Sequence, residues 1–349
     1  DGLNRLDYIT DANGKTDYDY DDVSNLENID YPNGLRTNYV YDDLNRLRSM
    51  STKVLQSDAL ISSYSYELYD DGKREKETDH TGRTAEYIYN DLGFLEKETV
   101  TDPVNGNSLR EYQYDNVGNR DYEIIDGVHT AYTYDKNDRL EQTGGKHYTY
   151  DDNGNTKTVT EDNTVITYSY NIDNKLTEAK TEVSGQVTSL VTYTYDYDGN
   201  RISKTEGENT TYYIVDPNRD YAQVLVEKDQ SNNIKVQYTY GHDLVSQTAS
   251  GTTSYFIYDG HGSTRALTDT SGAVTDTYNY SAFGELLNQT GTTENSYRYT
   301  GEQWDASLNQ YYLRARYYDQ SIGRFTQMDT FQGWENDPRS LHKYVYGHA

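Results

Sequence analysis

The chain has 349 residues and carries 58 Asp and Glu against 31 Lys and Arg, which gives a formal net charge of −27. Such an acidic chain repels phosphate, so its charge disfavours nucleic-acid binding and docking on an anionic membrane. It has no cysteine, which excludes disulfides and thiol chemistry. No apolar run approaches the roughly 18 residues of a membrane-spanning helix.

Tyrosine is the most informative residue type, because most of its 40 copies recur as Tyr-x-Tyr followed by an acid or Asn. Clear copies begin at Tyr18, Tyr39, Tyr64, Tyr87, Tyr112, Tyr132, Tyr148, Tyr168 and Tyr193, a degenerate one at Tyr212, and looser ones at Tyr238, Phe256, Tyr278 and Tyr297. Successive clear copies start 16 to 25 residues apart. Such a period predicts a repeat array in which each repeat is one supersecondary element.

Each repeat is predicted to be a β-hairpin. Residues i and i+2 of a strand point to the same face, so both tyrosines of a copy share one face. Turn residues follow, as in Asp115–Arg120, and the second strand begins at Arg or Lys plus an apolar residue, as in Arg46-Leu47. Isolated hairpins are marginal in water, so we expect them to pair edge to edge in a spiral antiparallel sheet. We also expect the tyrosine rings of neighbouring strands to lie opposite one another.

The first six residues of the sequence match part of a repeat. Asp1–Leu6 matches the turn and strand start at Asp42–Leu47. We therefore expect the sequence to be a fragment that begins within a repeat, with more repeats before Asp1.

The pattern becomes more specific from residue 255 onward, which predicts a repeat array over 1–254 and a distinct domain over 255–349. The distinctive stretches are Tyr258–Arg265, Tyr280–Glu285, Tyr299–Asp305, Leu308–Asp319, Gly323–Phe325 and Asp329.

These stretches resemble the Rhs repeat-associated core, and the upstream copies resemble the YD repeats of the Rhs family over essentially the whole chain. The resemblance implies an all-β fold, a spiral of stacked antiparallel hairpins that forms a barrel or cocoon-like shell closed at its C-terminal end by the core. It also implies a secreted or surface-delivered bacterial protein whose own C-terminal toxin effector is the enclosed cargo, with upstream repeats or a delivery component as further partners. The residues that match the core motif are Tyr311, Tyr312, Arg314, Arg316, Tyr318, Asp319, Gly323, Arg324 and Phe325.

Several toxin members of this family cut themselves with an aspartic autoprotease at an Asp-Pro-x-Gly-Leu motif, and by position Arg316 and Asp329 match residues implicated in that cleavage. A carboxylate can act as acid or base on a peptide bond, and a nearby Arg lowers its pKa. The chain departs from the pattern at Tyr317, where some cleaving members have Asp, and it ends at Ala349 before any such motif. The alternative is a structural role, in which Arg316 pairs with Asp319 or Asp329. Apart from self-cleavage, we expect no enzymatic activity.

Other motifs favour structural roles. Strings such as Asp151–Gly154 have Gly at the fourth position, whereas a calcium-binding EF-hand loop needs Gly at the sixth and Glu at the twelfth, so turns are predicted. The histidines lack zinc-ligand spacing, and His261 is expected to be a turn residue. We expect no metal and no cofactor. Trp304 and Trp334 could stack on sugars, so a surface module that binds glycans or partner cells is the alternative to the shell.

Overall fold

The computed structural model describes residues 1–219, 221–334 and 336–346. The chain divides into two compact units. Unit 1 comprises Asp1–Ile88, Glu98–Ser108 and Gln237–Glu302, and unit 2 comprises Tyr89–Lys97, Leu109–Val236 and Gln303–Ala349. Both units consist almost entirely of antiparallel β-structure, so the all-β prediction of stacked antiparallel hairpins is confirmed.

Strands of unit 1 pair with their neighbours in sequence order from β1 to β8 and again from β23 to β27. Its strands are β1 (Tyr8–Asp11), β2 (Gly14–Tyr20), β3 (Leu26–Asp30), β4 (Leu35–Tyr41), β5 (Leu47–Val54), β6 (Leu60–Leu68), β7 (Arg74–Asp79), β8 (Thr84–Tyr89), β9 (Leu95–Thr101), β22 (Ile234–Tyr240), β23 (Leu244–Ala249), β24 (Thr252–Tyr258), β25 (Thr264–Thr268), β26 (Val274–Tyr280) and β27 (Leu286–Thr290), followed by the 3-10 helix η1 (Tyr299–Gly301). Four of the five unit boundaries fall within strands, namely β8, β9, β10 (Ser108–Tyr114) and β22.

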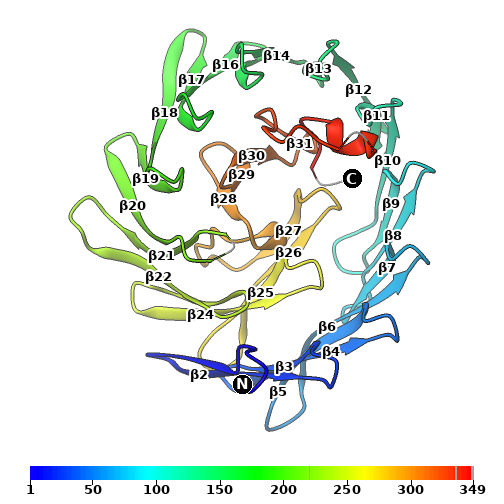
Figure 1. Cartoon of the computed structure of the whole chain (residues 1–349), viewed down its shortest axis with the longest axis vertical. Helices are drawn as coiled ribbons and strands as arrows, with labels where there is room; N and C mark the ends of the chain where they lie inside the picture. Colours follow the sequence, from blue (N-terminus) through cyan, green and yellow to red (C-terminus); the bar gives the residue numbers. More distant parts are fainter. Residues whose placement is uncertain (220, 335, 347–349) are drawn as a thin grey trace. The chain divides into compact units, whose positions relative to one another are not determined.

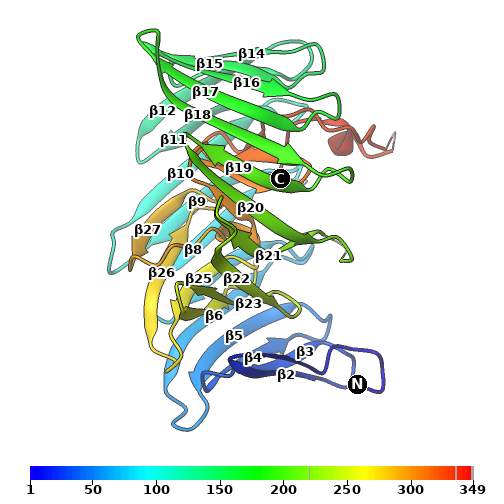
Figure 2. The same ribbon diagram turned by 90° about the vertical axis from the view of Figure 1, so that its left-hand side faces the viewer.

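Unit 2 contains a second run of hairpins in which β10 to β21 pair in sequence order, and Figure 2 shows β14 to β20 side by side. These strands are β10 (Ser108–Tyr114), β11 (Arg120–Ile125), β12 (Val128–Tyr134), β13 (Leu140–Thr143), β14 (Lys146–Tyr150), β15 (Thr156–Glu161), β16 (Thr164–Tyr170), β17 (Leu176–Val183), β18 (Gln186–Tyr195), β19 (Arg201–Glu206), β20 (Asn209–Asp216) and β21 (Gln223–Lys228).

A separate four-stranded antiparallel sheet completes unit 2. Its strands are β28 (Gln303–Asp305), β29 (Gln310–Leu313), β30 (Arg316–Asp319) and β31 (Arg324–Phe325), and the 3-10 helix η2 (Pro338–Leu341) follows. Figure 1 shows this small sheet on the inner side of the arc that β11 to β19 of the same unit describe. The predicted domain boundary between residues 254 and 255 falls inside β24 and does not coincide with a boundary between the two compact units. The division into a repeat array and a distinct C-terminal domain stays a prediction.

The turns between Tyr-x-Tyr strands and their partners share one construction, which Asp42 illustrates. Its carboxylate Oδ1 accepts the backbone N–H of Leu44 at 2.9 Å and that of Arg46 at 3.0 Å. Asn45 has a φ of 60°, which Asn tolerates better than most residues. At Asp151, where a calcium loop was the alternative, the carboxylate likewise accepts the N–H groups of Asn153 and Asn155. The turn interpretation is confirmed.

Both tyrosines of a copy do lie on the same face. In β16, Tyr168 is buried and Tyr170 is half-buried, whereas Ser169 between them is exposed. The hydroxyl of the second tyrosine donates to a backbone carbonyl at the start of an earlier strand, as from Tyr170 to Thr156 at 2.8 Å. Equivalent bonds run from Tyr20, Tyr41, Tyr134, Tyr150, Tyr195 and Tyr258. Each of these seven bonds joins a hairpin to the one before it.

The expectation that tyrosine rings lie opposite one another across neighbouring strands is wrong for these repeats. Tyr39 lies opposite Met50, and Tyr168 lies opposite Ala179. The reason is that the partner strands of these two tyrosines, β5 and β17, contain no tyrosine. The register also shifts immediately before the second tyrosine of the copy, for example between Ser169 and Tyr170. Such a β-bulge adds a residue to the partner strand and increases the local twist. The residues opposite the rings range from aliphatic ones to charged ones, as Glu77 opposite Tyr66 and Lys204 opposite Tyr193 show. In the small sheet, by contrast, tyrosines do pair across strands.

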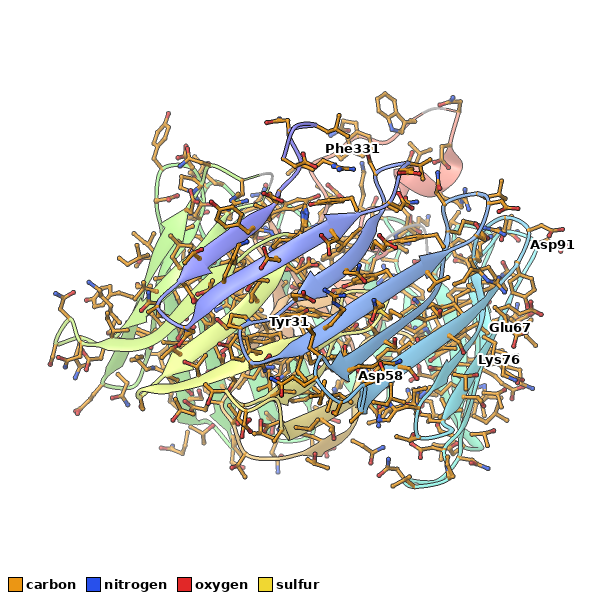
Figure 3. The ribbon with its side chains drawn as sticks, turned by 90° about the horizontal axis from the view of Figure 1, so that it is seen from below. Tyr31, Asp58, Glu67, Lys76, Asp91 and Phe331 are labelled. Atoms are coloured by element: carbon orange, nitrogen blue, oxygen red, sulfur yellow. The ribbon has the colours of Figure 1, made fainter. Side chains whose placement is uncertain are left out.

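In Figure 3 the labelled Glu67 and Lys76 mark residues of opposite charge on the solvent-exposed face of unit 1. They lie opposite one another on β6 and β7, and Lys76 Nζ also lies 2.8 Å from Glu86 Oε1 on β8. Such exposed pairs contribute little to stability. The buried contacts of the opposite face therefore carry most of the free energy of the sheet.

Candidate functional site

The small sheet of unit 2 is fixed to the hairpin array by a buried ion pair. Arg201, the first residue of β19, places Nη1 2.9 Å from Asp305 Oδ2 at the end of β28. Only 2% of the Arg201 side chain and 1% of the Asp305 side chain are exposed. Lys204 Nζ lies 2.7 Å from the other oxygen of Asp305, and the Tyr193 hydroxyl donates to Oδ2 at 3.0 Å.

Further contacts surround the guanidinium of Arg201. It donates to the Tyr317 hydroxyl and to Gln303 Oε1, both at 2.8 Å, and its carbon lies 4.1 Å from the ring centre of Tyr312. Burial raises the pKa of Asp305, but Arg201 and Lys204 outweigh it and hold that pKa below its ordinary value. The pair is therefore charged, and the five groups that touch it compensate its removal from water.

Arg324 of β31 forms the second attachment to the array. Its guanidinium donates to Asn119 Oδ1 at 3.0 Å and to the backbone carbonyl of Asp138. It also lies 4.8 Å from the ring centre of Tyr134 and 5.4 Å from that of Tyr344. A residue of the predicted core motif thus reaches turns and strands that lie about two hundred positions earlier in the sequence.

The other residues of the core motif take clear positions. Tyr311, Tyr312, Tyr318 and Phe325 are buried. Gly323 adopts a φ of 66° in the turn before β31. The remaining three, Arg314, Arg316 and Asp319, are partly exposed.

Arg314 and Asp319 each have contacts of their own. The guanidinium of Arg314 lies 4.8 Å from the ring centre of Tyr221, and its carbonyl accepts Lys175 Nζ. Asp319 accepts the N–H and the hydroxyl of Ser321, at 3.0 and 2.6 Å, and burial raises its pKa.

Arg316 and Asp329, the two predicted catalytic residues, do lie together. Arg316 Nη2 is 2.7 Å from Asp329 Oδ2, and both side chains are partly exposed. Of the two partners considered for Arg316, Asp329 is thus the one that the structure brings to it. Burial lowers the pKa of Arg316, while Asp329 opposes that shift. Arg316 also lies over the ring of Phe325, 3.6 Å from its centre.

Both oxygens of Asp329 have partners, which limits what the carboxylate can do in this arrangement. Oδ2 contacts Arg316, and Oδ1 accepts the N–H of Phe331 at 2.9 Å. Arg316 Nη1 and the N–H of Asp329 both donate to the backbone carbonyl of Lys343, at 3.2 and 3.0 Å. The pair therefore connects β30 to two later parts of the chain, and a reacting peptide bond would have to displace one of these contacts.

The aromatic residues considered for sugar binding differ in exposure. Trp304 packs against Tyr311 with ring centres 4.9 Å apart. Trp334 is 63% exposed and lies 5.5 Å from Phe331, which is 47% exposed and labelled in Figure 3. His261 lies in the turn between β24 and β25, where its N–H donates to Asp259 Oδ1 at 2.9 Å, so its prediction as a turn residue is confirmed. Within residues 1–219, 221–334 and 336–346, no three His, Asp or Glu side chains are placed to hold a metal ion.

A family model described as Teneurin YD-shell matches residues 71–349. The chain belongs to this family. Among curated proteins, this YD-shell chain is 32% identical over 370 residues to the tRNA3(Ser)-specific nuclease WapA of Bacillus spizizenii and, equally, to the tRNA nuclease WapA of Bacillus subtilis strain 168. Each match covers 99% of the chain but only 15% of the relative.

A solved structure, the Tc holotoxin pore of Photorhabdus luminescens, shares the fold of the YD-shell chain with a TM-score of 0.77 at 17% identity. That match covers 95% of the chain and 18% of the solved chain. It shows the fold and nothing about activity. None of the helices in the part of the chain that the structure describes is long and apolar enough to cross a membrane.

Unit 1 of the YD-shell chain contains a buried charge network that the sequence analysis missed. Arg265 of β25 places Nη1 3.0 Å from both Glu77 Oε1 of β7 and Asp259 Oδ2. Arg74 pairs with the same Glu77 at 3.0 Å. The buried Arg265 also donates to the carbonyl of Tyr278 and contacts the ring of Tyr64.

The sequence pattern singled out the two buried arginines, Arg265 and Arg201, but not their partners. Arg265 closes the Tyr258–Arg265 stretch, which stood out as specific, and Arg201 occupies the recurrent position after a turn where a second strand begins. Neither signal could reveal the acidic partners, because Glu77 is 188 positions from Arg265 and Asp305 is 104 positions from Arg201.

Proposed function

We propose that this chain is part of the wall of a secreted or surface-delivered bacterial shell that encloses and presents a C-terminal toxin effector. The observation that carries the proposal is the match of almost the whole chain to two tRNA nucleases of which it covers only 15%. The shared part is the hairpin array with its small sheet, and it accounts for only a small share of these much longer relatives. We therefore assign the chain containment.

Charge supports containment over RNA chemistry. With a net charge of −27 the chain repels the phosphates of tRNA, and an RNA-binding surface needs basic residues. Its buried arginines are engaged in internal contacts: Arg201 with Asp305, Arg265 with Glu77 and Asp259. These cations hold the wall together and do not face a nucleic acid.

Protease protection of the complete gene product tests the proposal. The intact protein is digested with a nonspecific protease, and fragments are followed by mass spectrometry. We expect the effector to survive in the intact shell and to be degraded once Arg201→Ala loosens the small sheet of unit 2. An exposed Tyr197→Ala variant is the matched control, because Tyr197 is fully exposed. An effector that is degraded as fast in the intact protein as alone, or a gene product without any further domain, contradicts containment.

Self-cleavage by Arg316 and Asp329 is a second candidate function, favoured by their 2.7 Å approach at a partly exposed position. A carboxylate beside a guanidinium can take a proton from an attacking group. The complete gene product is compared with its Asp329→Asn variant by gel mobility, with Asp337→Asn as a control on a nearby carboxylate. Loss of cleavage in Asp329→Asn alone supports the assignment. Cleavage that continues in that variant removes Asp329 from the mechanism.

Glycan binding is a third candidate, favoured by the exposed aromatic pair of Trp334 and Phe331. Two aromatic faces at the surface can stack on the apolar faces of a sugar. A glycan array probed with the wild-type chain, Trp334→Ala and the control Tyr197→Ala decides this. Dose-dependent binding that Trp334→Ala abolishes and Tyr197→Ala leaves intact supports adhesion. Absence of binding, or equal binding by all three proteins, contradicts it.

A further inference from the structure

The C-terminal segment, residues 342–346, returns to the small sheet of unit 2 and extends it. The N–H of Phe325 donates to the carbonyl of Tyr344 at 2.8 Å, and Arg324 forms an antiparallel bridge with Val345. The hydroxyl of Tyr344 donates to the carbonyl of Gly154 at 2.8 Å. Five contiguous residues thus dock by backbone pairing and aromatic contacts on β31 and on the array.

His342 connects this segment to the turn between β10 and β11 through Asn119. The amide orientation of Asn119 is fixed, because its Nδ2 donates to Asp115 Oδ2 at 3.0 Å and to Asp138 Oδ1 at 2.9 Å. Its Oδ1 is therefore the atom that lies 2.9 Å from His342 Nε2. A carbonyl oxygen can only accept, so His342 must carry its proton on Nε2.

The other nitrogen of the ring must then be without a proton. His342 Nδ1 accepts the backbone N–H of Tyr344 at 3.1 Å and that of Val345 at 3.2 Å. A second proton on the ring would place an N–H against these two N–H donors, and neither contact would survive. The docked geometry of the C-terminal segment therefore requires a neutral imidazole.

The charges that face His342 also favour a neutral imidazole. Arg324 of β31 donates to the same Asn119 oxygen, so a protonated imidazole would place its positive charge close to that of a guanidinium. Asp115, from the turn, is the acidic group that opposes this, and the ring of Tyr344 lies 6.5 Å away on the segment itself. Burial is the main cause that lowers the pKa of His342 to about 3, and Arg324 adds to the shift.

We propose that the C-terminal segment is a pH-sensitive element, which docks on β31 while His342 is neutral and detaches when that imidazole is protonated. Detachment also removes the carbonyl of Lys343 from Arg316 and from the N–H of Asp329, so acid loosens the surroundings of that pair. The element works in this way whether or not the array encloses a cargo, and it therefore goes beyond the proposed function.

The direction and size of the effect follow from the two protonation states. The ordinary pKa of histidine, 6.5, applies to the detached segment, and about 3 applies to the docked one. Docking is therefore complete above pH 6.5 and weakens as the pH falls from 6.5 toward 3. Between pH 7.5 and pH 5.0 the docking equilibrium is expected to fall about 30-fold.

Hydrogen–deuterium exchange of the whole chain at pH 7.5 and pH 5.0 tests the proposal. Protection factors, corrected for the intrinsic pH dependence of exchange, are compared for the amides of Phe325, Tyr344 and Val345. We expect them to fall about 30-fold in the wild type at pH 5.0 and to be independent of pH in His342→Gln. The control His147→Gln, which changes an exposed histidine of β14, should behave as the wild type. Constant protection in the wild type, or an equal fall in His342→Gln, overturns the proposal.

A second measurement covers the case in which His342→Gln fails to dock at any pH. Nitrogen-15 spectra of histidine-labelled wild-type protein follow the imidazole directly, and the signals missing from His342→Gln assign it. We expect a neutral ring with its proton on Nε2 that titrates well below pH 5. A ring that titrates near pH 6.5, or one protonated on Nδ1, overturns the proposal.

Discussion

The buried ion pair between Arg201 and Asp305 gives the sharpest prediction about stability. Asp305→Ala removes a carboxylate of which 1% is exposed and leaves Arg201, of which 2% is exposed, without its negative partner. Lys204, at 17% exposure, can turn toward solvent, but Arg201 cannot do so without breaking its contacts with Tyr317 and Gln303. An uncompensated buried charge costs about 3 to 5 kcal/mol, so the attachment of β28 to β19 should weaken by that amount.

Local measurement is needed, because a repeat array does not unfold in one step. Hydrogen exchange of the amides in β19 and β28 should accelerate by roughly a hundredfold or more in Asp305→Ala, since about 1.4 kcal/mol corresponds to a factor of ten. Asp198→Ala, which changes an exposed turn residue, is the control and should leave both strands unchanged. The double variant Arg201→Met with Asp305→Leu should recover most of the loss, because it removes both charges and fills the space.

Three outcomes would refute this reasoning. Exchange in Asp305→Ala that changes less than threefold would mean that the pair carries little energy. Equal effects in Asp198→Ala would mean that the response is not specific to the pair. A double variant no more stable than Asp305→Ala would mean that the lost carboxylate, and not the stranded charge, causes the effect.

Two further predictions concern the hairpins of unit 2. Tyr170→Phe removes a hydroxyl that donates to the neighbouring hairpin, and hydrogen exchange should show a loss of about 1 kcal/mol in local stability. The control Tyr197→Phe changes a fully exposed ring and should show no measurable loss. Equal effects in the two variants would contradict a role for this bond. Gly118→Ala places a Cβ 2.6 Å from a ring carbon of Phe94 at a φ of +95°. The control Gly127→Ala has a similar φ of +87°, but its Cβ meets no atom within 4 Å. Thermal denaturation should therefore show a larger loss of stability for Gly118→Ala than for Gly127→Ala. Strain at positive φ alone is about 1 to 2 kcal/mol, and indistinguishable variants would mean that the contact with Phe94 is relieved without cost.

Repetition is the reason why so much of the fold was predictable from the sequence. In each Tyr-x-Tyr copy the alternation with a period of two predicts a strand. The Asp and Gly that follow, such as Asp151 and Gly154, predict a turn. A signal that recurs many times identifies the element even where single copies are degenerate. The register was not predictable, because the bulge before the second tyrosine shifts the pairing by one residue, so that Ser169 lies opposite Glu178 and Tyr170 opposite Leu176.

The candidate site was predictable only in part. The resemblance selected Arg316 and Asp329, and the structure places them 2.7 Å apart. The ion pairs that hold the small sheet and the network around Arg265 were not predicted, because their partners lie a hundred or more positions apart. Only the folded array brings such residues together, and local sequence patterns do not predict contacts between them.

Electron cryomicroscopy of the complete gene product tests the central claim of containment most directly. The account predicts a continuous wall of β-hairpins, with residues 1–349 as part of it, and additional density for the effector inside that wall. An effector that lies wholly outside the wall as a folded, accessible domain would contradict it.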